Sequence, residues 1–334
     1  MYFLESIMTC KEKRDQRSYE IVQKYRSGLF LNVLISIIGE LPDPYTVKAG
    51  VGGMMAYSPK MMAAVCFMLE FERTTYRSMA DRLRSNHSMA KKIGFASATP
   101  SRSTISRAYG LIPESYFELV HRHIIATIGI GHAVAVDSTG FSIRRNVRWL
   151  DHKTDKVKVK REWLKLHAII DVNTRTVLEY LISEKNVADV TALKHMFKNF
   201  ANRDDVAGAD FCADAAYLSR EVCNIADGLG MKPYIDVKKN TTSRSGGSHS
   251  WYIMVRTNRY DKEQWDEHYH QRSIIEAVFS ALKTLYGSHL RCTRDDNQRK
   301  ELVIRTILYN AEKTFQHRIN VDALTEEMLA VKAA

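Results

Sequence analysis

Apolar residues recur at helical spacing through much of the first 130 residues. Ser58 and Pro59 have the composition of a helix start, with Ser58 as N-cap and Pro59 at the first helical position. The pattern predicts an all-helical N-terminal domain over residues 1–130. Its expected helices cover residues 17–41, a segment from residue 59, residues 76–83, a segment after Thr99-Pro100, and a segment from Pro113 to about residue 126.

Near residue 131 the pattern changes to the alternation typical of β-strands. Asp171 to Thr174 has the composition of a hairpin turn. The expected elements are strands at 132–143, 163–172 and 176–183, a helix at 189–201, a strand at 208–217, a helix to about 229, a strand at 232–237, and helices at 272–286 and 300–316.

Three early strands joined by short turns should pair antiparallel, whereas later strands that alternate with helices should pair parallel. The prediction is therefore an α+β or α/β domain over residues 131–315, built on a mixed sheet flanked by helices. A Ser/Gly/Lys-rich stretch at 238–250 is expected to be a mobile loop, and residues 316–334 a C-terminal tail. This order of elements resembles the ribonuclease-H-like fold.

The charge balance narrows the class of partner. Lys and Arg number 49 against 38 Asp and Glu, which gives a formal net charge of +11. Such a surplus suits a protein that neutralises nucleic-acid phosphates, although an ordinary basic protein fits it equally well. The five cysteines include no C-x-x-C pair, which argues against a disulfide framework or a structural zinc site and favours a reducing, intracellular setting. We see no signal peptide and no membrane span in the sequence.

Two aspartates follow apolar strands. Asp137 ends the run Ala-Val-Ala-Val, and Asp214 ends Phe-Cys-Ala. Carboxylates at adjacent strand ends can face one cleft, where they repel each other unless a cation lies between them. Mg²⁺ is the natural cation, because it prefers oxygen ligands and keeps several waters. Each aspartate taken alone is more simply a solvated strand-end carboxylate.

A third acid lies in the helix predicted at 272–286. Helical spacing puts Arg272, Glu276 and Lys283 on one stripe, with Tyr269 at its leading end. A carboxylate between two cations combines a metal ligand with groups that bind a phosphodiester. The simpler alternative for Glu276 is a surface ion pair with Arg272.

These residues carry a resemblance. Tyr269, Arg272, Glu276 and Lys283 match the Y-(2)-R-(3)-E-(6)-K signature of DDE insertion-sequence transposases, and the motifs AVDSTGF and ADAAY resemble that group's first two acidic motifs. The resemblance covers about residues 131–310, and residues 58–83 look like the helical N-terminal region of relatives. Only 62 residues separate Asp214 from Glu276, so no large β insertion is expected between them.

The resemblance implies a DNA transposase that binds the ends of its mobile element and catalyses metal-dependent strand cleavage and strand transfer. It implies two Mg²⁺ or Mn²⁺ ions, with Asp137 bridging both and Asp214 and Glu276 each holding one. Arg272 and Lys283 would bind phosphates near the scissile bond, and Tyr269 would either contact DNA or pack. The implied partner is double-stranded DNA of the element ends and the target, bound by a homodimer, without any membrane, in the nucleoid-associated cytoplasm of a prokaryotic cell.

Further DNA contacts are predicted outside the signature. Residues 76–110 resemble a helix-turn-helix in which Arg102 and Arg107 lie on the second helix, although an ordinary helix pair remains the alternative. His167 is expected to be a core histidine. A basic run between the first two strands is a candidate DNA contact or a solvated face, and its members include Arg144, Arg145, Lys158, Lys160 and Arg161.

Two other functions stay open at this point. A catalytically silent or domesticated copy would bind DNA without cutting it. A structure-specific nuclease on the same fold would cut without preferring element ends and without joining strands.

Overall fold

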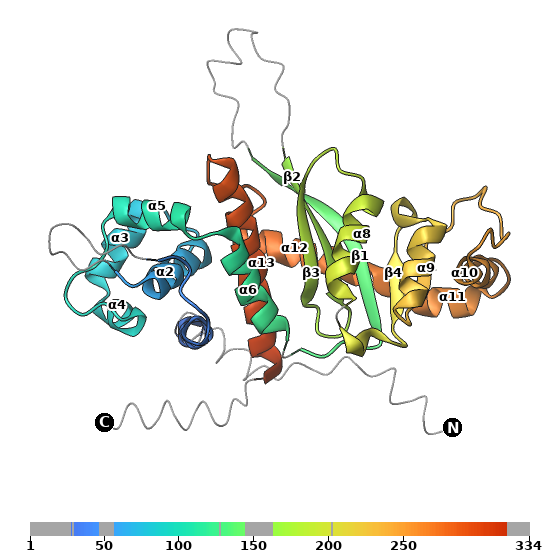
Figure 1. Cartoon of the computed structure of the whole chain (residues 1–334), viewed down its shortest axis with the longest axis horizontal. Coiled ribbons are helices and arrows are strands. Elements are labelled where there is room, and N and C mark those ends of the chain that lie inside the picture. Colours follow the sequence, from blue (N-terminus) through green and yellow to red (C-terminus); the bar gives the residue numbers. More distant parts are fainter. Residues whose placement is uncertain are drawn as a thin grey trace, which may run out of the picture.

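The structure is a computed structural model that describes residues 28, 30–46, 57–126, 128–143, 163–201 and 203–318 of the chain. A helical N-terminal region lies at one end, and a sheet flanked by helices occupies the rest (Figure 1). The buried apolar side chains form one continuous core that extends from the helical region into the sheet region. No helix of the described residues is long and apolar enough to cross a membrane.

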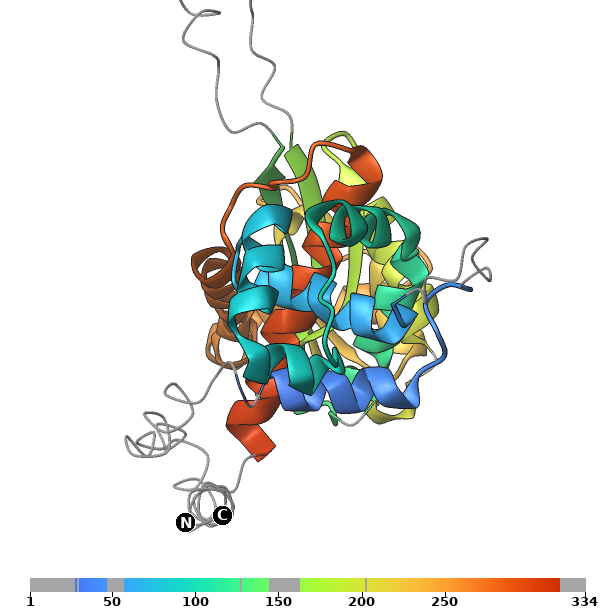
Figure 2. The same cartoon turned by 90° about the vertical axis from the view of Figure 1, so that its left-hand side faces the viewer.

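When the molecule is viewed from the side of its N-terminal region, the helices of that region lie in front of the sheet (Figure 2). Pro59 takes the first helical position as predicted, but the side chain of Ser58 makes no capping hydrogen bond. The short helix α4 was not predicted; the Asn86 side chain caps it by accepting from the amide of Met89. The helices are residues 30–40, α2 (Pro59–Phe71), α3 (Tyr76–Ser85), α4 (His87–Ile93), α5 (Arg102–Leu111) and α6 (Glu114–Ile125).

The sheet has five strands in the order β3-β2-β1-β4-β5. The pairs β1–β2 and β2–β3 are antiparallel, and the pairs β1–β4 and β4–β5 are parallel, so the predicted mixed sheet is confirmed. The predicted hairpin turn is also present, because Asp171 Oδ2 accepts from the Thr174 amide at 2.6 Å. The strands are β1 (Ala133–Ser142), β2 (Trp163–Asp171), β3 (Val177–Glu184), β4 (Asp210–Ala213) and β5 (Lys232–Ile235).

Helices lie on both faces of this sheet. Alternate residues of β1 show this directly, since Ser138 contacts α8 whereas Asp137 and Thr139 contact the segment around α12. The helices and turns are α8 (Asp189–Phe200), η1 (Asp204–Val206), η2 (Ala215–Tyr217), α9 (Arg220–Gly228), α10 (His249–Tyr260), α11 (Lys262–Tyr269), η3 (His270–Arg272), α12 (Ser273–Tyr286) and α13 (Asp295–Arg318).

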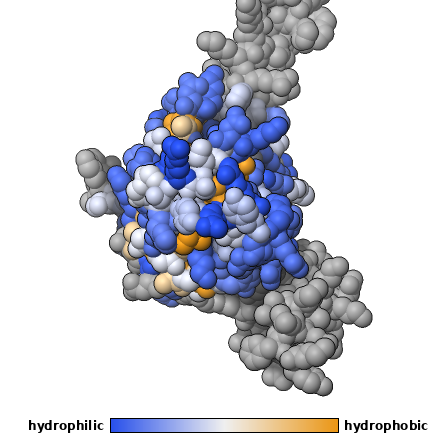
Figure 3. All heavy atoms as spheres, turned by 90° about the vertical axis from the view of Figure 1, so that its right-hand side faces the viewer, coloured by the Kyte–Doolittle hydropathy of each residue, from blue (hydrophilic) through white to orange (hydrophobic). Residues whose placement is uncertain are grey.

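The helices α10 and α11 were not predicted from the sequence. They fill the chain between β5 and α12, and the expected absence of a β insertion is confirmed there, since the described residues 236–272 contain no strand. The molecular surface at this end is mainly hydrophilic, with a few separate hydrophobic spots (Figure 3).

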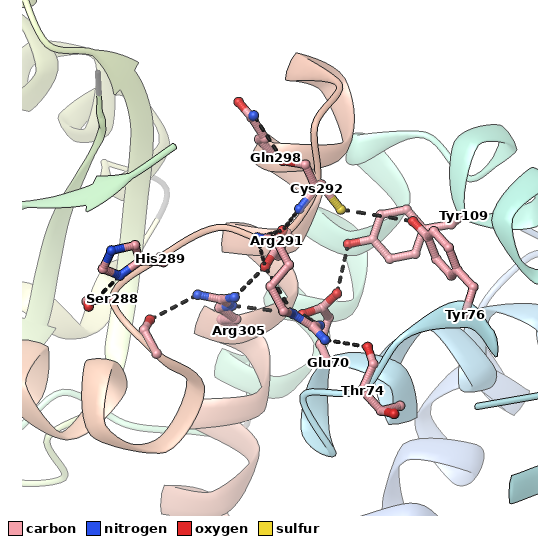
Figure 4. A network of polar contacts seen from close by, with 12 residues as sticks. Glu70, Thr74, Tyr76, Tyr109, Ser288, His289, Arg291, Cys292, Gln298 and Arg305 are labelled. Carbon is pink, nitrogen blue, oxygen red and sulfur yellow. Dashed lines mark hydrogen bonds and ion pairs between the residues drawn. The ribbon is translucent and has the colours of Figure 1, made fainter. Parts of the chain in front are cut away.

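A buried Glu–Arg cluster joins the helical region to the sheet region (Figure 4). It consists of Glu70 on α2, Arg291 on the link before α13, and Glu301 and Arg305 on α13. Arg291 pairs with Glu70, and Arg305 pairs with Glu301. Glu301 also accepts hydrogen bonds from the backbone amides of Arg291 and Cys292, both at 2.8 Å.

The Glu–Arg cluster reaches two neighbouring elements. Arg291 donates to the carbonyl of Thr74, which precedes α3. Arg305 Nη1 donates to the carbonyl of Gly287, just after α12, at 2.9 Å. The cluster thus ties the N-terminal helices to the end of the helix that carries Glu276.

Candidate active site

Asp137 and Asp214 lie side by side in the middle of the sheet, where the pairing of the inner strands β1 and β4 ends. The parallel pairing of β1 with β4 ends at Val136 and Ala213, and the two aspartates are the next residue on each strand. Neighbouring strands lie about 4.8 Å apart, so the two carboxylates share one region. The strand predicted at 132–143 is confirmed as β1, and Asp137 lies inside it instead of at its end, because β1 continues to Ser142 by pairing with β2. Only the pairing with β4 stops before Asp137.

Local hydrogen bonds fix both aspartates. Asp214 is the N-cap of η2, and its Oδ1 accepts from the amide of Ala216 at 2.9 Å. Asp137 Oδ1 accepts from the amide of Ser138 at 2.7 Å. Each carboxylate therefore keeps a second oxygen for another partner.

Arg272 connects Asp137 to Glu276. Its Nη1 lies 3.5 Å from Asp137 Oδ2, and its Nη2 lies 2.9 Å from Glu276 Oε1. The side chain of Glu276 is 59% exposed, whereas those of Asp137 and Arg272 are about one-fifth exposed. Arg272 thus joins Asp137 to Glu276, and Asp214 lies beside Asp137, close enough for its charge to act on Arg272. Glu276 is the acid most open to solvent. We call Asp137, Asp214 and Glu276 the carboxylate site.

The helix predicted at 272–286 is confirmed as α12, which carries Glu276 and Lys283 and has Arg272 as its N-cap residue. Tyr269 ends α11, and the 3₁₀ turn η3 separates it from α12. The rings of Tyr269 and Trp265 stack with centroids 5.5 Å apart. Burial, ahead of the charges of Asp236 and Asp214, raises the pKa of Tyr269. Tyr269 therefore packs on α11 and remains beside the carboxylate site.

Lys283 reaches the same face of β1. Its Nζ donates to Thr139 Oγ1 at 2.6 Å and lies 5.4 Å from the centre of the Phe141 ring. Burial lowers the pKa of this ammonium group. Thr139 is two residues beyond Asp137, so Lys283 is directed toward the strand that carries the first acid.

The electrostatics of Asp137 reflect crowding by acids. Burial raises the pKa of Asp137, the charges of Asp214 and Glu276 raise it further, and Arg272 and the Ser138 amide act in the opposite direction. Burial lowers the pKa of Arg272, but its acidic neighbours outweigh that effect and the net pKa is raised. One arginine serves three carboxylates, which leaves the site with an excess of negative charge.

The donor set fits a hard divalent cation. Carboxylate oxygens are the ligands that Mg²⁺ prefers, and mutual repulsion among acids favours a cation between them. Among the residues that the structure describes, no three acidic, histidine or cysteine side chains have metal-ligand spacing. The guanidinium of Arg272 contacts both Asp137 and Glu276, so these carboxylates converge on a cation already.

Asp189 supports the site from the opposite face of the sheet and was missed by the sequence reasoning. Its Oδ1 accepts from Ser138 Oγ at 2.9 Å and from Lys165 Nζ at 2.8 Å. Ser138 is the residue whose amide holds Asp137, so Asp189 anchors the strand next to that acid. The one signal in the sequence was an acid at the first turn of the helix at 189–201.

His167 is buried, as expected of a core histidine. Its Nε2 lies 2.8 Å from Ser183 Oγ, and its Nδ1 faces Asp189 Oδ1 at 3.3 Å. Burial, helped by the charge of Lys165, lowers the pKa of His167 to about 4, so the ring is neutral at pH 7.

The other predicted DNA contacts fall into two groups. Arg102 and Arg107 are exposed on α5, in the N-terminal helical region (Figure 1). The predicted helix-turn-helix stretch contains three helices, α3, α4 and α5, instead of two. Arg144, Arg145, Lys158, Lys160 and Arg161 lie outside the residues that the structure describes.

The sheet order, with acids where the pairing of β1 with β4 ends, defines a ribonuclease-H-like fold of the transposase type. The model of the "Transposase DDE domain" matches residues 131–311, which is more than half of the chain, and that of the "Transposase domain (DUF772)" matches residues 23–110. The chain therefore belongs to the DDE transposase family. Enzymes with this domain transfer phosphoryl groups of DNA and use divalent metal ions.

One solved structure shares the fold. The piggyBac transposase, in a synaptic complex with hairpin DNA, is similar with a TM-score of 0.50 at 10% identity, over 88% of this chain and 72% of that chain. A pre-cleavage Mos1 transpososome also matches, with a TM-score of 0.24 at 12% identity over 80% of each chain. The first likeness shows a shared fold.

Proposed function

We propose that this protein is an active transposase of the insertion-sequence group with the Y-(2)-R-(3)-E-(6)-K signature. It binds the ends of its mobile element, cuts them and joins them to target DNA. The observation that carries the proposal is that Asp137 and Asp214 follow two paired strands side by side, while Arg272 joins Asp137 to Glu276. Membership of the DDE transposase family supports it.

We assign Asp137 to both ions of a metal pair, and Asp214 and Glu276 to one ion each. Bound Mg²⁺ or Mn²⁺ supplies activation of a water or a DNA 3′-hydroxyl and stabilisation of the leaving oxygen. The protein's part is to hold its acids: the amides of Ser138 and Ala216 orient the two aspartates. Glu276 is the most exposed of the three acids, which suits the ligand that closes last on DNA.

Arg272 and Lys283, the two basic residues of the signature, bind the phosphodiester. Arg272 has a planar fork that suits bidentate phosphate contact once its carboxylate partners hold metal ions. Lys283 presents a compact charge two residues along β1 from Asp137. Tyr269 braces this segment through its stacking on Trp265.

We assign residues 1–130 to recognition of element ends and residues 131–315 to catalysis, with 316–334 as a tail. The exposed Arg102 and Arg107 are candidate contacts to the element end. Cutting two ends in one reaction calls for at least two copies of the chain, so we propose a homodimer on DNA that acts in the nucleoid-associated cytoplasm of a prokaryotic cell.

The test is cleavage and joining of a labelled duplex that carries the element end, with Mg²⁺ or Mn²⁺. We compare wild type with Asp137→Asn, Asp214→Asn and Glu276→Gln, and use Glu263→Gln, an exposed acid on α11, as the matched control. Each active-site substitution should lower cleavage by at least about 100-fold while DNA binding survives, and the control should cut normally.

Other outcomes identify the other functions. A wild type that binds the element end but never cuts is the silent DNA-binding copy. Cutting of random duplexes as readily as element ends, without joining, identifies a structure-specific nuclease. Cleavage that survives all three substitutions rejects the carboxylate site.

A further inference from the structure

The segment between β5 and α11 has an unusual composition. From Val237 to Tyr260 it contains no Asp or Glu, and its cations are Lys238, Lys239, Arg244, Arg256 and Arg259. Three aromatic residues, Trp251, Tyr252 and Tyr260, accompany them. The rest of the chain has 44 Lys and Arg against 38 Asp and Glu, so this short stretch without acids is a local concentration of positive charge.

The outer stripe of α10 presents a guanidinium between two aromatic rings. Arg256 lies 5.5 Å from the ring centre of Tyr252 and 5.6 Å from that of Tyr260, and its Nη1 donates to the Tyr252 hydroxyl at 2.6 Å. The three residues are four positions apart, so they form one row on the helix. Tyr260 is 77% exposed, and within the described part of the chain Arg256 makes no ion pair with a carboxylate. This charge is therefore held in place and still available to an external anion.

The preceding loop is held rather than loose. Arg220 Nε donates to the carbonyl of Ser245 at 3.0 Å, and its guanidinium lies 4.7 Å from the centre of the Trp251 ring. Trp251 Nε1 donates to the carbonyl of Thr242 at 3.0 Å. The inner residues of α10, including Met254 and Val255, are buried. The loop and the helix thus form one prebuilt surface, which lowers the ordering cost of binding.

This surface starts at the same end of the parallel strands as the carboxylate site. The amide of Asp236, which follows β5, donates to the carbonyl of Ala213 at 3.1 Å, and Ala213 directly precedes Asp214. Besides burial, the charges of both Asp236 and Asp214 raise the pKa of Tyr269, so both acids lie near its ring. A duplex bound at the carboxylate site therefore runs within reach of the segment that leads to α10.

We propose that the loop 237–248 and the outer stripe of α10 form a second DNA-contact surface, here called the α10 surface, which binds the backbone of duplex flanking the scissile phosphate. Unpaired cations suit phosphate oxygens, and a planar guanidinium suits bidentate contact with them. The exposed Tyr260 ring gives the flanking strand a packing face. The inference rests on DNA being the substrate, as proposed above.

The test measures the salt dependence of binding to a labelled duplex of random sequence, because backbone contacts do not depend on sequence. All variants carry Asp137→Asn so that cleavage cannot change the probe. Arg256→Gln removes one phosphate contact and should reduce the slope of log affinity against log salt by about 1. Lys198→Gln, an exposed charge removal on α8, is the matched control and should leave the slope unchanged.

Two further measurements separate this inference from the proposed function. Lys238→Gln with Lys239→Gln should lower the slope again without touching α10, so misfolding of the helix cannot explain both results. A slope unchanged by all of these substitutions overturns the α10 surface even if wild type cuts element ends. If the slope is reduced but the wild-type protein never cuts element ends, the α10 surface is retained and the transposase proposal is rejected. Equal competition by polyglutamate and by duplex also overturns it, since the surface then takes any polyanion.

Discussion

The molecule contains two clusters of acids and arginines that differ in how completely their charges are paired. In the Glu–Arg cluster two glutamates face two arginines, and Glu301 and Arg305 are 0% and 1% exposed. In the carboxylate site three acids share Arg272, because Lys283 is bonded to Thr139. The Glu–Arg cluster has as many acids as arginines, whereas the carboxylate site has more acids than cations that pair with them.

This difference shows how an ion network that stabilises the fold can be distinguished from one that is suited to binding metal ions. An unpaired charge in the interior costs several kcal/mol, so a buried network must balance its charges. At a site that water reaches, an excess of acids is tolerated. Burial, helped by the charges of Asp214 and Glu276, raises the pKa of Asp137 there. That excess favours divalent cations. Substitutions in the first cluster should therefore change stability, and those in the second should change activity.

The largest expected effect is a loss of stability when the Glu–Arg cluster loses one acid. Glu301→Gln should lower the free energy of unfolding by about 3–5 kcal/mol, because it leaves Arg291 and Arg305 with one acid between them. Urea denaturation followed by tryptophan fluorescence measures this. Glu263→Gln, on the exposed surface of α11, should stay within about 0.5 kcal/mol of wild type. A similarly small change for Glu301→Gln would remove the distinction between the two clusters.

The next effect is a pH dependence carried by Glu70. Burial, ahead of repulsion from Glu301, raises the pKa of Glu70 to about 7 from its ordinary 4.5. The folded protein then holds a proton that the unfolded chain releases, so this contribution to stability is complete below about pH 4.5 and is lost as the pH rises through about 7. The size of the shift corresponds to about 3 kcal/mol.

The measurement compares unfolding free energies of wild type and Glu70→Gln across this window. Wild type should lose stability relative to the variant as the pH rises, because a glutamine has no proton to release. Parallel curves for the two proteins would mean that Glu70 is ionised throughout the window. The Glu–Arg cluster would then be neutral by ion pairing at every pH tested.

Much of the fold and the carboxylate site could be predicted because the signals are local. Each aspartate follows a short apolar strand, and Arg272 and Glu276 are four residues apart in the sequence. Their meeting in space then depends only on β1 and β4 being neighbours, which the order of strands and helices made predictable.

What could not be predicted depends on distant partners or mixed patterns. Glu70 and Arg291 are separated by more than 200 residues, and the sequence around either residue contains no signal that predicts their ion pair. The helix α10 was missed because its apolar face is short and its start follows a Ser/Gly-rich loop. Asp137 was taken for a strand end because pairing of β1 with β2 outlasts its pairing with β4.

The smallest of these effects tests the comparison most sharply, because it removes an arginine from the open cluster. Arg272→Gln should lower cleavage by about 10- to 100-fold through loss of a group that orients Asp137 and Glu276. Unfolding stability should change by no more than about 1 kcal/mol, since the partners are hydrated. Arg272→Lys keeps the charge but not the fork and should recover only part of the rate. If Arg272→Gln instead lost stability on the scale expected for Glu301→Gln, Arg272 would be a structural partner like Arg305, and an excess of acids would no longer distinguish the carboxylate site from the Glu–Arg cluster.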